Sequence, residues 1–234
     1  MKNNSFTTMA FVSLLAVAAV CSCDKDKDKD NNNNSKSGFI QNNAIEINLE
    51  NGGRYSEKVD TVKLTIYSEE LHRSVALVSV PYGNGKFTLK LPTSVDAKYL
   101  KDFHFEYADE ARKGLTISDS KVQESNVSLL AYKAGSEVGA LRYGVEDWDK
   151  AENWDRDVYL TYVDRDVSIT GSYTGIDSGK EVKGAKYSYS YSVNMKKGWN
   201  LRYEEGKVKA ENLYEITITT QIPAEAKWYL YLRN

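Results

Sequence analysis

The chain contains very little cysteine. Its 234 residues include only two cysteines, Cys21 and Cys23, and both lie close to the N-terminus. No residue after position 23 can therefore form a disulfide, act as a thiol nucleophile or offer a thiolate to a metal ion. From the residues available we predict neither a metal site nor a cofactor.

Histidine is equally scarce, and neither charge sign is in marked excess. His72 and His104 match no nucleophile or zinc pattern, so we expect both to be ordinary surface residues. The formal net charge is −2, and no basic patch with interleaved aromatic residues occurs. This composition argues against nucleic acid as a partner and favours a protein that is not an enzyme.

The N-terminal apolar run is too short to cross a membrane. Met9 to Val20 falls below the roughly 20 apolar residues that a spanning helix needs. Lys2 precedes this run, and small residues and a cysteine follow it. That order is typical of a secretory signal peptide, which we place at residues 1–22.

The residues before Cys23 resemble the lipobox of bacterial lipoproteins. Val20 supplies the aliphatic residue three positions before Cys23, and Ser22 supplies the small residue directly before it. Cys21 fits less well, because Val20 would have to occupy the small position. The resemblance implies that Cys23 is lipidated and anchors the protein to a membrane.

Residues 23–40 are predicted to be a disordered tether. Asp24 to Asp30 alternates in charge, and Asn31 to Ser37 is polar with almost no apolar residue, so this stretch cannot bury enough surface to fold. Its acidic start resembles the surface-export signal of Bacteroidetes lipoproteins. We therefore predict an outer-membrane protein that is lipid-anchored and displayed at the cell surface.

Apolar and polar residues alternate with period two from Ile45 onward, which predicts strands. The predicted strands are 45–49, 62–67, 75–80, 87–91, 103–107, 127–132, 138–143, 158–162, 167–171, 187–193, 199–203, 214–218 and 228–232. Asn84-Gly85 and Gly135-Ser136 are predicted hairpin turns, and 171–184 a glycine-containing loop. Only 95–100 and 108–113 are compatible with a helix.

This pattern predicts an all-β fold. We expect two β-sandwich modules in tandem, at 41–145 and 146–234, joined near the acidic segment Glu146 to Asp157. One continuous sandwich or barrel is the alternative.

Several short pieces resemble uncharacterised two-module β lipoproteins of gut Bacteroidetes. They are Asn84 to Leu89, Tyr162 to Val167 and Lys197 to Leu201, taken together with the lipobox. That group has no established catalytic residues to transfer, so the resemblance implies a location and a fold.

The segment Glu146 to Asp157 is the predicted ligand-binding site. Tryptophan offers the widest apolar ring for stacking on a sugar, and neighbouring carboxylates can accept hydrogen bonds from hydroxyls. The residues proposed for this role are Trp148, Trp154, Asp147, Asp149 and Asp155. In the alternative, these tryptophans fill a seam between modules. Tyr187, Tyr189 and Tyr191 could form a second platform, but we expect them to be buried.

The sequence leaves three candidate functions. The favoured one is a non-catalytic lipoprotein, facing the cell surface or the periplasm, that binds a glycan or a protein or is an accessory part of a surface assembly. The second is a structural or adhesion subunit that pairs through exposed strand edges. The third is a small hydrolase that uses two carboxylates.

Overall fold

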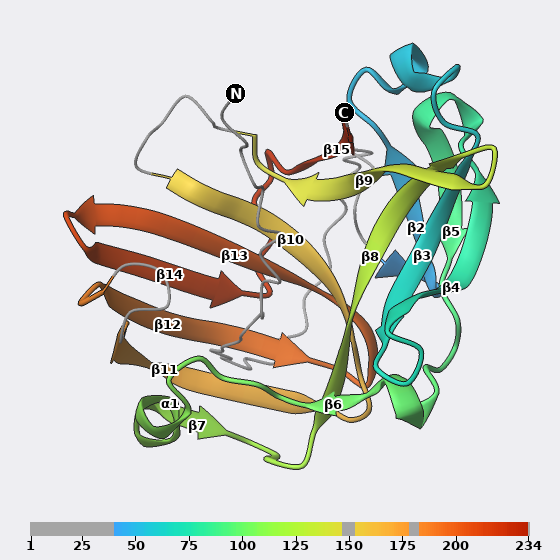
Figure 1. The fold of residues 1–234 in the computed structure, drawn as a ribbon. Helices are drawn as coiled ribbons and strands as arrows, with labels where there is room; N and C mark the ends of the chain where they lie inside the picture. Colours follow the sequence, from blue (N-terminus) through green and yellow to red (C-terminus); the bar gives the residue numbers. More distant parts are fainter. Residues whose placement is uncertain (1–39, 147–152, 178–182, 234) are drawn as a thin grey trace, which may run out of the picture.

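The protein is built almost entirely of β-strands, as the alternation predicts. The computed structural model describes residues 40–146, 153–177 and 183–233. Fifteen strands form two sheets, with one α-helix and three short 3-10 helices between them (Figure 1). The all-β prediction is confirmed.

The smaller sheet has three antiparallel strands in the order β1-β2-β5. These are β1 (Ile40–Gln41), β2 (Ala44–Asn48) and β5 (Lys86–Lys90). Ile45 lies opposite Leu89 in the register, and both side chains are fully buried. One face of this sheet is therefore a core face.

The larger sheet has twelve strands, ten of them in the order β4-β3-β8-β9-β10-β13-β14-β12-β11-β7. The strand β15 pairs with β9, and β6 pairs with β8. Within the described residues, the strand pairs are antiparallel except for β12 with β14. The bounds are β3 (Thr61–Ser68), β4 (Arg73–Pro81), β6 (Lys101–Asp102), β7 (Leu115–Ile117), β8 (Gln123–Lys133), β9 (Ser136–Gly144), β10 (Asn153–Val163), β11 (Val167–Ile176), β12 (Lys186–Met195), β13 (Gly198–Ala210), β14 (Leu213–Thr219) and β15 (Lys227–Leu232).

The buried apolar residues form two clusters. The first, which we call the sandwich cluster, packs the small sheet against one part of the large sheet. On the right of Figure 1 this part includes β3 and β8. It contains Ile45, Ile47, Leu49, Val62, Leu64, Ile66, Leu89, Leu129, Leu141, Tyr143, Leu160, Tyr162, Trp199, Trp228 and Leu230, among others.

The second, the tyrosine cluster, lies against β11, β12 and β14 at the lower left of Figure 1. Among the described residues, no second sheet covers it. Phe103, Phe105 and Tyr107 pack onto it, as does Ala111 of the helix α1 (Ala108–Gly114). The cluster consists of Ala111, Val122, Val163, Val167, Ile169, Tyr173, Tyr189, Tyr191, Val193, Met195, Ile216 and Ile218.

Neighbouring residues of β10 belong to different clusters. Because side chains alternate across a strand, Tyr162 of β10 joins the sandwich cluster while the adjacent Val163 joins the tyrosine cluster. On β13, Tyr203 joins the sandwich cluster, and its neighbour Arg202 is fully buried on the other face. Strand β10 thus contributes to both cores, whereas the apolar residues of β13 belong to the sandwich cluster.

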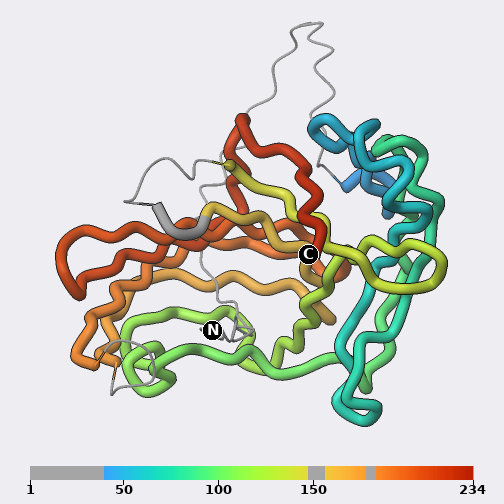
Figure 2. Tube along the Cα trace, turned by 45° about the horizontal axis from the view of Figure 1, so that its top comes forward, coloured from blue at the N-terminus to red at the C-terminus, as the bar shows by residue number. Residues whose placement is uncertain are grey.

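Each cluster draws residues from both sides of the predicted division at 145/146. Figure 2 shows the red C-terminal end returning beside the yellow-green strand β9, and β15 pairs with β9 from Lys227↔Gly144 to Leu232↔Gly139. In the other direction, Ala111 and Val122 enter the tyrosine cluster. The division at 145/146 itself remains a sequence-based prediction.

Three local predictions were wrong. The Asn84-Gly85 turn does not make a hairpin, because β4 pairs with β3 while β5 pairs with β2 in the other sheet. Residues 103–105 are not a strand, and Tyr107, in a left-handed conformation, precedes α1. Residues 171–176 belong to β11 rather than to a loop, because they pair along their length with β12.

Other local predictions are confirmed. A hairpin joins β8 and β9 as predicted, but its turn lies one residue earlier than the predicted Gly135-Ser136. Lys133 pairs with Ser136, so the turn is Ala134-Gly135, and both of its residues have positive φ. The predicted helix at 108–113 is α1, and the stretch 95–100 contains the 3-10 helix η3 (Ala97–Tyr99).

Candidate functional site

The residues predicted to bind ligand fall largely outside the described part of the chain. Asp147, Trp148 and Asp149 lie between residues 146 and 153, and the lipidation site Cys23 precedes residue 40. Trp154 and Asp155 belong to the first residues of β10, where the structure describes the backbone alone. Their proposed roles therefore stay predictions.

The tyrosine row of β12 is a core feature, as expected. Tyr189 and Tyr191 are buried, and Tyr187 is half-buried. Tyr173 stacks on Tyr189 with 4.9 Å between ring centroids, and its hydroxyl lies 3.1 Å from the hydroxyl of Tyr191. Burial raises the pKa of Tyr173, Tyr189 and Tyr191 above the usual value for tyrosine. These rings offer no open platform for a sugar.

The two histidines lie on the surface, as the sequence indicated. His72 has a positive φ in the turn between β3 and β4, and His104 is exposed in the segment before α1. Among the described residues, no three His, Cys, Asp or Glu side chains are grouped so that they could hold a metal ion.

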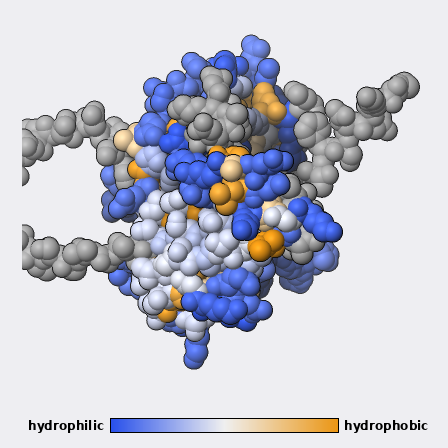
Figure 3. Space-filling model, turned by 90° about the vertical axis from the view of Figure 1, so that its left-hand side faces the viewer, coloured by the Kyte–Doolittle hydropathy of each residue, from blue (hydrophilic) through white to orange (hydrophobic). Residues whose placement is uncertain are grey.

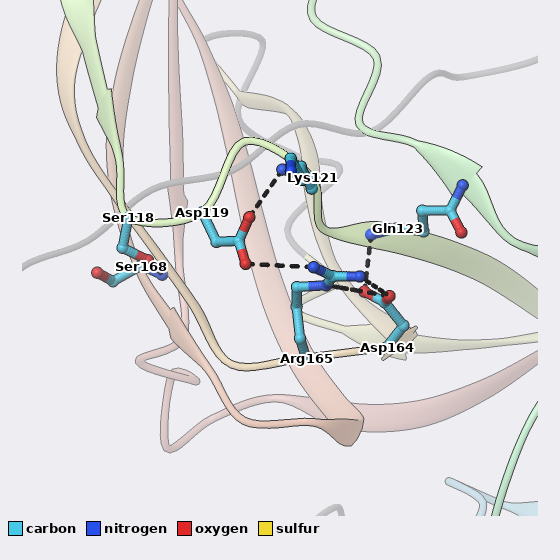
Figure 4. A network of polar contacts seen from close by, with 7 residues as sticks. All are labelled: Ser118, Asp119, Lys121, Gln123, Asp164, Arg165 and Ser168. Carbon is cyan, nitrogen blue, oxygen red and sulfur yellow. Dashed lines mark hydrogen bonds and ion pairs between the residues drawn. The ribbon is translucent and has the colours of Figure 1, made fainter.

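The motif Asp164-Arg165-Asp166 fastens the turn between β10 and β11 to a neighbouring loop (Figure 4). A carboxylate oxygen of Asp164 accepts a hydrogen bond of 2.9 Å from the backbone N–H of Gln123, and Arg165 donates to both oxygens of the same carboxylate. Arg165 also reaches Asp119, with 3.4 Å between Nη1 and Oδ2. These contacts hold the pKa of Asp164 below its usual value, chiefly through the Arg165 hydrogen bonds.

Asp166 fastens the same turn to the segment between β12 and β13. Its carboxylate accepts hydrogen bonds from the backbone N–H of Lys197 at 2.9 Å and from Nζ of Lys196 at 2.7 Å. A little further on, Nε1 of Trp199 donates to the carbonyl oxygen of Pro92 at 2.6 Å. The sequence pieces Tyr162 to Val167 and Lys197 to Leu201, which carried the family resemblance, thus have a structural role, because they join the loops at one end of the sheet.

An open polar pocket lies at the end of the small sheet and supplies a different candidate site. Its volume is about 630 Å³, within the range of small-ligand sites. It is lined by Asn48, Leu49, Asn51, Gly52, Gly53, Arg54, Asn84 and Lys86. We call it the Arg54–Lys86 pocket.

Two glycine turns in contact with each other form part of this pocket. They belong to the 3-10 helices η1 (Gly52–Tyr55) and η2 (Gly83–Gly85). A Cβ atom on Gly52 would lie 2.7 Å from the Cα of Gly85, and one on Gly85 would lie 2.6 Å from the Cα of Gly52. The turns can meet this closely only because both residues are glycine.

A buried tyrosine fixes the turns in place. The Tyr82 hydroxyl donates a hydrogen bond of 2.7 Å to the carbonyl oxygen of Gly52, and the backbone N–H of Leu49 donates to Gly85 at 2.8 Å. Burial raises the pKa of Tyr82 to about 12, so the donor keeps its proton at neutral pH. Ser56 adds a hydrogen bond of 2.8 Å to Oδ1 of Asn84. The pocket is therefore preformed.

The pocket lining is positively charged in an otherwise slightly acidic protein. It contains the cations Arg54 and Lys86 and no Asp or Glu. Neither cation is in an ion pair within the described part of the chain, and the Arg54 guanidinium lies 4.6 Å from the centre of the Tyr55 ring. Ion pairs with carboxylates are formed instead by Arg112, Arg142, Arg156, Arg165, Arg202 and Arg233.

Sequence reasoning did not find this pocket. Both of its turns carry a sequence signal, but Asn51-Gly52-Gly53 indicates the end of a strand and Asn84-Gly85 indicates a hairpin turn. Their meeting depends on β2 and β5 being neighbours, although almost forty residues separate them in sequence.

Comparisons with other proteins add no further assignment: no protein-family model, curated protein or solved structure matches this chain. No helix among the described residues is long and apolar enough to cross a membrane. The geometry of the described residues is therefore what supports a function.

Proposed function

We propose that this protein is a non-catalytic lipoprotein, anchored to the outer membrane through Cys23 and displayed at the cell surface, where it binds a glycan. The anchor follows from the resemblance of Val20 to Cys23 to a lipobox. Binding is supported by one structural observation, the preformed Arg54–Lys86 pocket.

The chemistry of the pocket suits recognition better than catalysis. The amides of Asn48, Asn51 and Asn84 can both donate and accept hydrogen bonds, as sugar hydroxyls require. No carboxylate lines the pocket, so the pair of acids that a glycosidase needs is not present at this site. An open, shallow site also admits a section of a long polymer.

The anchor is tested by the variant Cys23→Ser. We expect the wild-type chain to be recovered with outer membranes and to incorporate a radiolabelled fatty acid, and the variant to lose both properties. Cys21→Ser is the matched control and should keep both. Lipid labelling that persists in Cys23→Ser would contradict the proposed anchor.

Glycan binding is tested by tryptophan fluorescence. Trp199 and Trp228 are buried, so a change on titration with a polysaccharide would report mainly on Trp148 and Trp154. Replacing each of those two by phenylalanine separates the predicted loop site from the Arg54–Lys86 pocket. Binding that survives both replacements, measured by calorimetry because the two reporters are then absent, would exclude the predicted loop site and favour the pocket. Lack of binding to any polysaccharide by the wild-type chain, measured by calorimetry as well, would contradict glycan recognition.

A structural or adhesion subunit is the second candidate, and the strand β4 supports it. This strand of nine residues is the last in the large sheet and pairs there with β3 alone, so a strand from a partner could add to it. Pro81 at its end limits such pairing. An oligomer that depends on concentration, and persists in Trp148→Ala and Trp154→Ala, would favour this candidate.

A further inference from the structure

We infer that the Arg54–Lys86 pocket binds an acidic saccharide, that is, a sugar unit carrying a carboxylate or a sulfate. This inference rests on the proposed glycan-binding function and specifies the chemical class of the ligand. Its basis is the lining of the pocket, which holds two cations and three side-chain amides but no carboxylate.

The two cations are available to a ligand. Arg54 and Lys86 are exposed and have no ion-pair partner among the described residues. The Arg54 guanidinium lies beside the Tyr55 ring and its Nη2 donates a hydrogen bond to the Tyr55 hydroxyl, which restricts the side chain and lowers the entropy lost on binding. A guanidinium can hold a carboxylate or sulfate through two parallel hydrogen bonds, and a lysine adds a point charge.

The remaining lining indicates a sugar rather than a bare anion. A cavity of about 630 Å³ is much larger than a single sulfate ion needs. Asn48 is exposed on β2, directly opposite Lys86 in the strand register, so an amide and a cation lie side by side. Asn84 faces the same pocket, with its Oδ1 already bonded to Ser56. Amides beside a cation can bind the hydroxyls next to an acidic substituent.

The net charge of the protein indicates that an acidic polymer would bind locally. A formal net charge of −2 gives no general attraction to a polyanion, so such binding would have to arise at a cationic site. Such binding should weaken as salt is added, because exposed charges are screened.

The test uses the full chain in detergent and calorimetric titration with three kinds of probe. The acidic polymers are polygalacturonate and chondroitin sulfate, the neutral polymers are dextran and mannan, and the bare anions are sodium sulfate and sodium acetate. We expect the acidic polymers to bind, and the neutral polymers and bare anions to bind at least tenfold more weakly.

Two double variants locate the binding. Arg54→Gln with Lys86→Gln should weaken acidic-polymer binding at least about tenfold, because hydrogen bonds to charged groups are lost. Arg112→Gln with Lys113→Gln removes the same charge from the exposed helix α1, at another site, and should leave the affinity unchanged. Arg54→Lys with Lys86→Arg keeps both charges and should retain most of the affinity. Asn48→Ala should weaken acidic-polymer binding but not the binding of sulfate.

Several results would overturn the inference. One is an equal loss of affinity in the two charge-removing variants, which would indicate general electrostatics. Another is equal affinity for sulfate and for the acidic polymers, which would indicate an anion site that does not recognise sugar. Binding of neutral polymers alone would contradict the acidic class while leaving glycan recognition intact. If the wild-type chain is folded, as judged by circular dichroism, and binds no polymer, the proposed glycan-binding function itself fails.

Discussion

The sandwich cluster and the tyrosine cluster show two ways in which the apolar face of a β-sheet is covered. The sandwich cluster lies between two sheets and is rich in aliphatic residues such as Leu64 and Leu89. Within the part of the chain that the structure describes, the tyrosine cluster has no second sheet above it, and the segment with Phe103, Phe105 and Tyr107 packs onto it instead. Tyrosine suits this thinner cover, because its ring fills volume while its hydroxyl can pair or reach water.

The difference shows that burial of a row of tyrosines does not require a second sheet. Strand β10 connects the clusters, because Tyr162 belongs to one and Val163 to the other. Fully buried Arg202 lies on the neighbouring strand β13, with its Nη1 3.4 Å from Oε2 of Glu124 on β8, and its other two guanidinium nitrogens have no hydrogen-bond partner among the described residues. Four predictions use this comparison, from the largest expected effect to the smallest.

Arg202→Ala should give the largest loss of stability, because Arg202 is fully buried beside Glu124. Above about pH 7 Glu124 is ionised, and removing Arg202 then leaves a buried carboxylate uncompensated, which costs about 3–5 kcal/mol. We expect a loss of this size in the free energy of unfolding, measured by urea denaturation at pH 8. The double variant Arg202→Met with Glu124→Leu removes both charges and should be close to neutral. A loss below about 1 kcal/mol in the single variant would argue against a stabilising role of this pair.

Leu64→Ala should affect the sandwich cluster directly. Leu64 is fully buried in β3, and truncation of a buried leucine leaves a cavity that costs about 2–5 kcal/mol. Leu71→Ala, at an exposed position, is the matched control and should change stability by less than about 0.5 kcal/mol. The side-chain NMR signal of Tyr191 should be the same as in the wild-type protein, since Tyr191 belongs to the tyrosine cluster and Leu64 to the sandwich cluster. A change in that signal in folded Leu64→Ala would contradict the separation.

Stability should fall as the pH rises from about 4.5 to about 7. Burial raises the pKa of Glu124 to about 7, with Arg202 acting in the opposite direction. In this window the native state holds a proton that the unfolded state has released, so rising pH favours unfolding. The slope from this group is at most about 1.4 kcal/mol per pH unit, and it vanishes above the folded-state pKa. Urea denaturation at pH 5, 6, 7 and 8 measures it, and Glu124→Gln should remove this part of the slope. An unchanged slope in the variant would contradict the assignment.

Tyr191→Phe should have the smallest effect, within the tyrosine cluster. The change keeps the ring and removes the hydroxyl that lies 3.1 Å from the hydroxyl of Tyr173, at a cost of about 1 kcal/mol. Tyr67→Phe, at a residue that is 47% exposed, is the control and should leave thermal unfolding unchanged. Equal effects of the two substitutions would show that the buried hydroxyl pair contributes nothing specific.

Period-two alternation predicted most strands, because each strand buries one face and exposes the other. Tyr187 to Met195 is the clearest case, since the burial of β12 follows the sequence alternation along most of its length. Residues 103–107 alternate equally well and still form no strand, because Phe103, Phe105 and Tyr107 cover the tyrosine cluster instead of pairing.

Strand order and the candidate site were beyond the reach of the sequence. Alternation says which face of a strand is buried but not which strand lies next to it, so the separation of β4 from β5 and the parallel pairing of β12 with β14 were not foreseen. The Arg54–Lys86 pocket arises from that unforeseen order. The sequence did predict that His72 and His104 lie on the surface and that the β12 tyrosines face the core. These predictions need only the residues next to each position, and not the order of the strands.

The position of β15 determines when the protein can complete its fold. This strand pairs with β9 and places Trp228 and Leu230 in the sandwich cluster, which also contains Ile45 and Ile47. The cluster therefore cannot close during synthesis until the residues of β15 have emerged from the ribosome. Contacts so distant in sequence form slowly, so closure of this core should be a late step of folding.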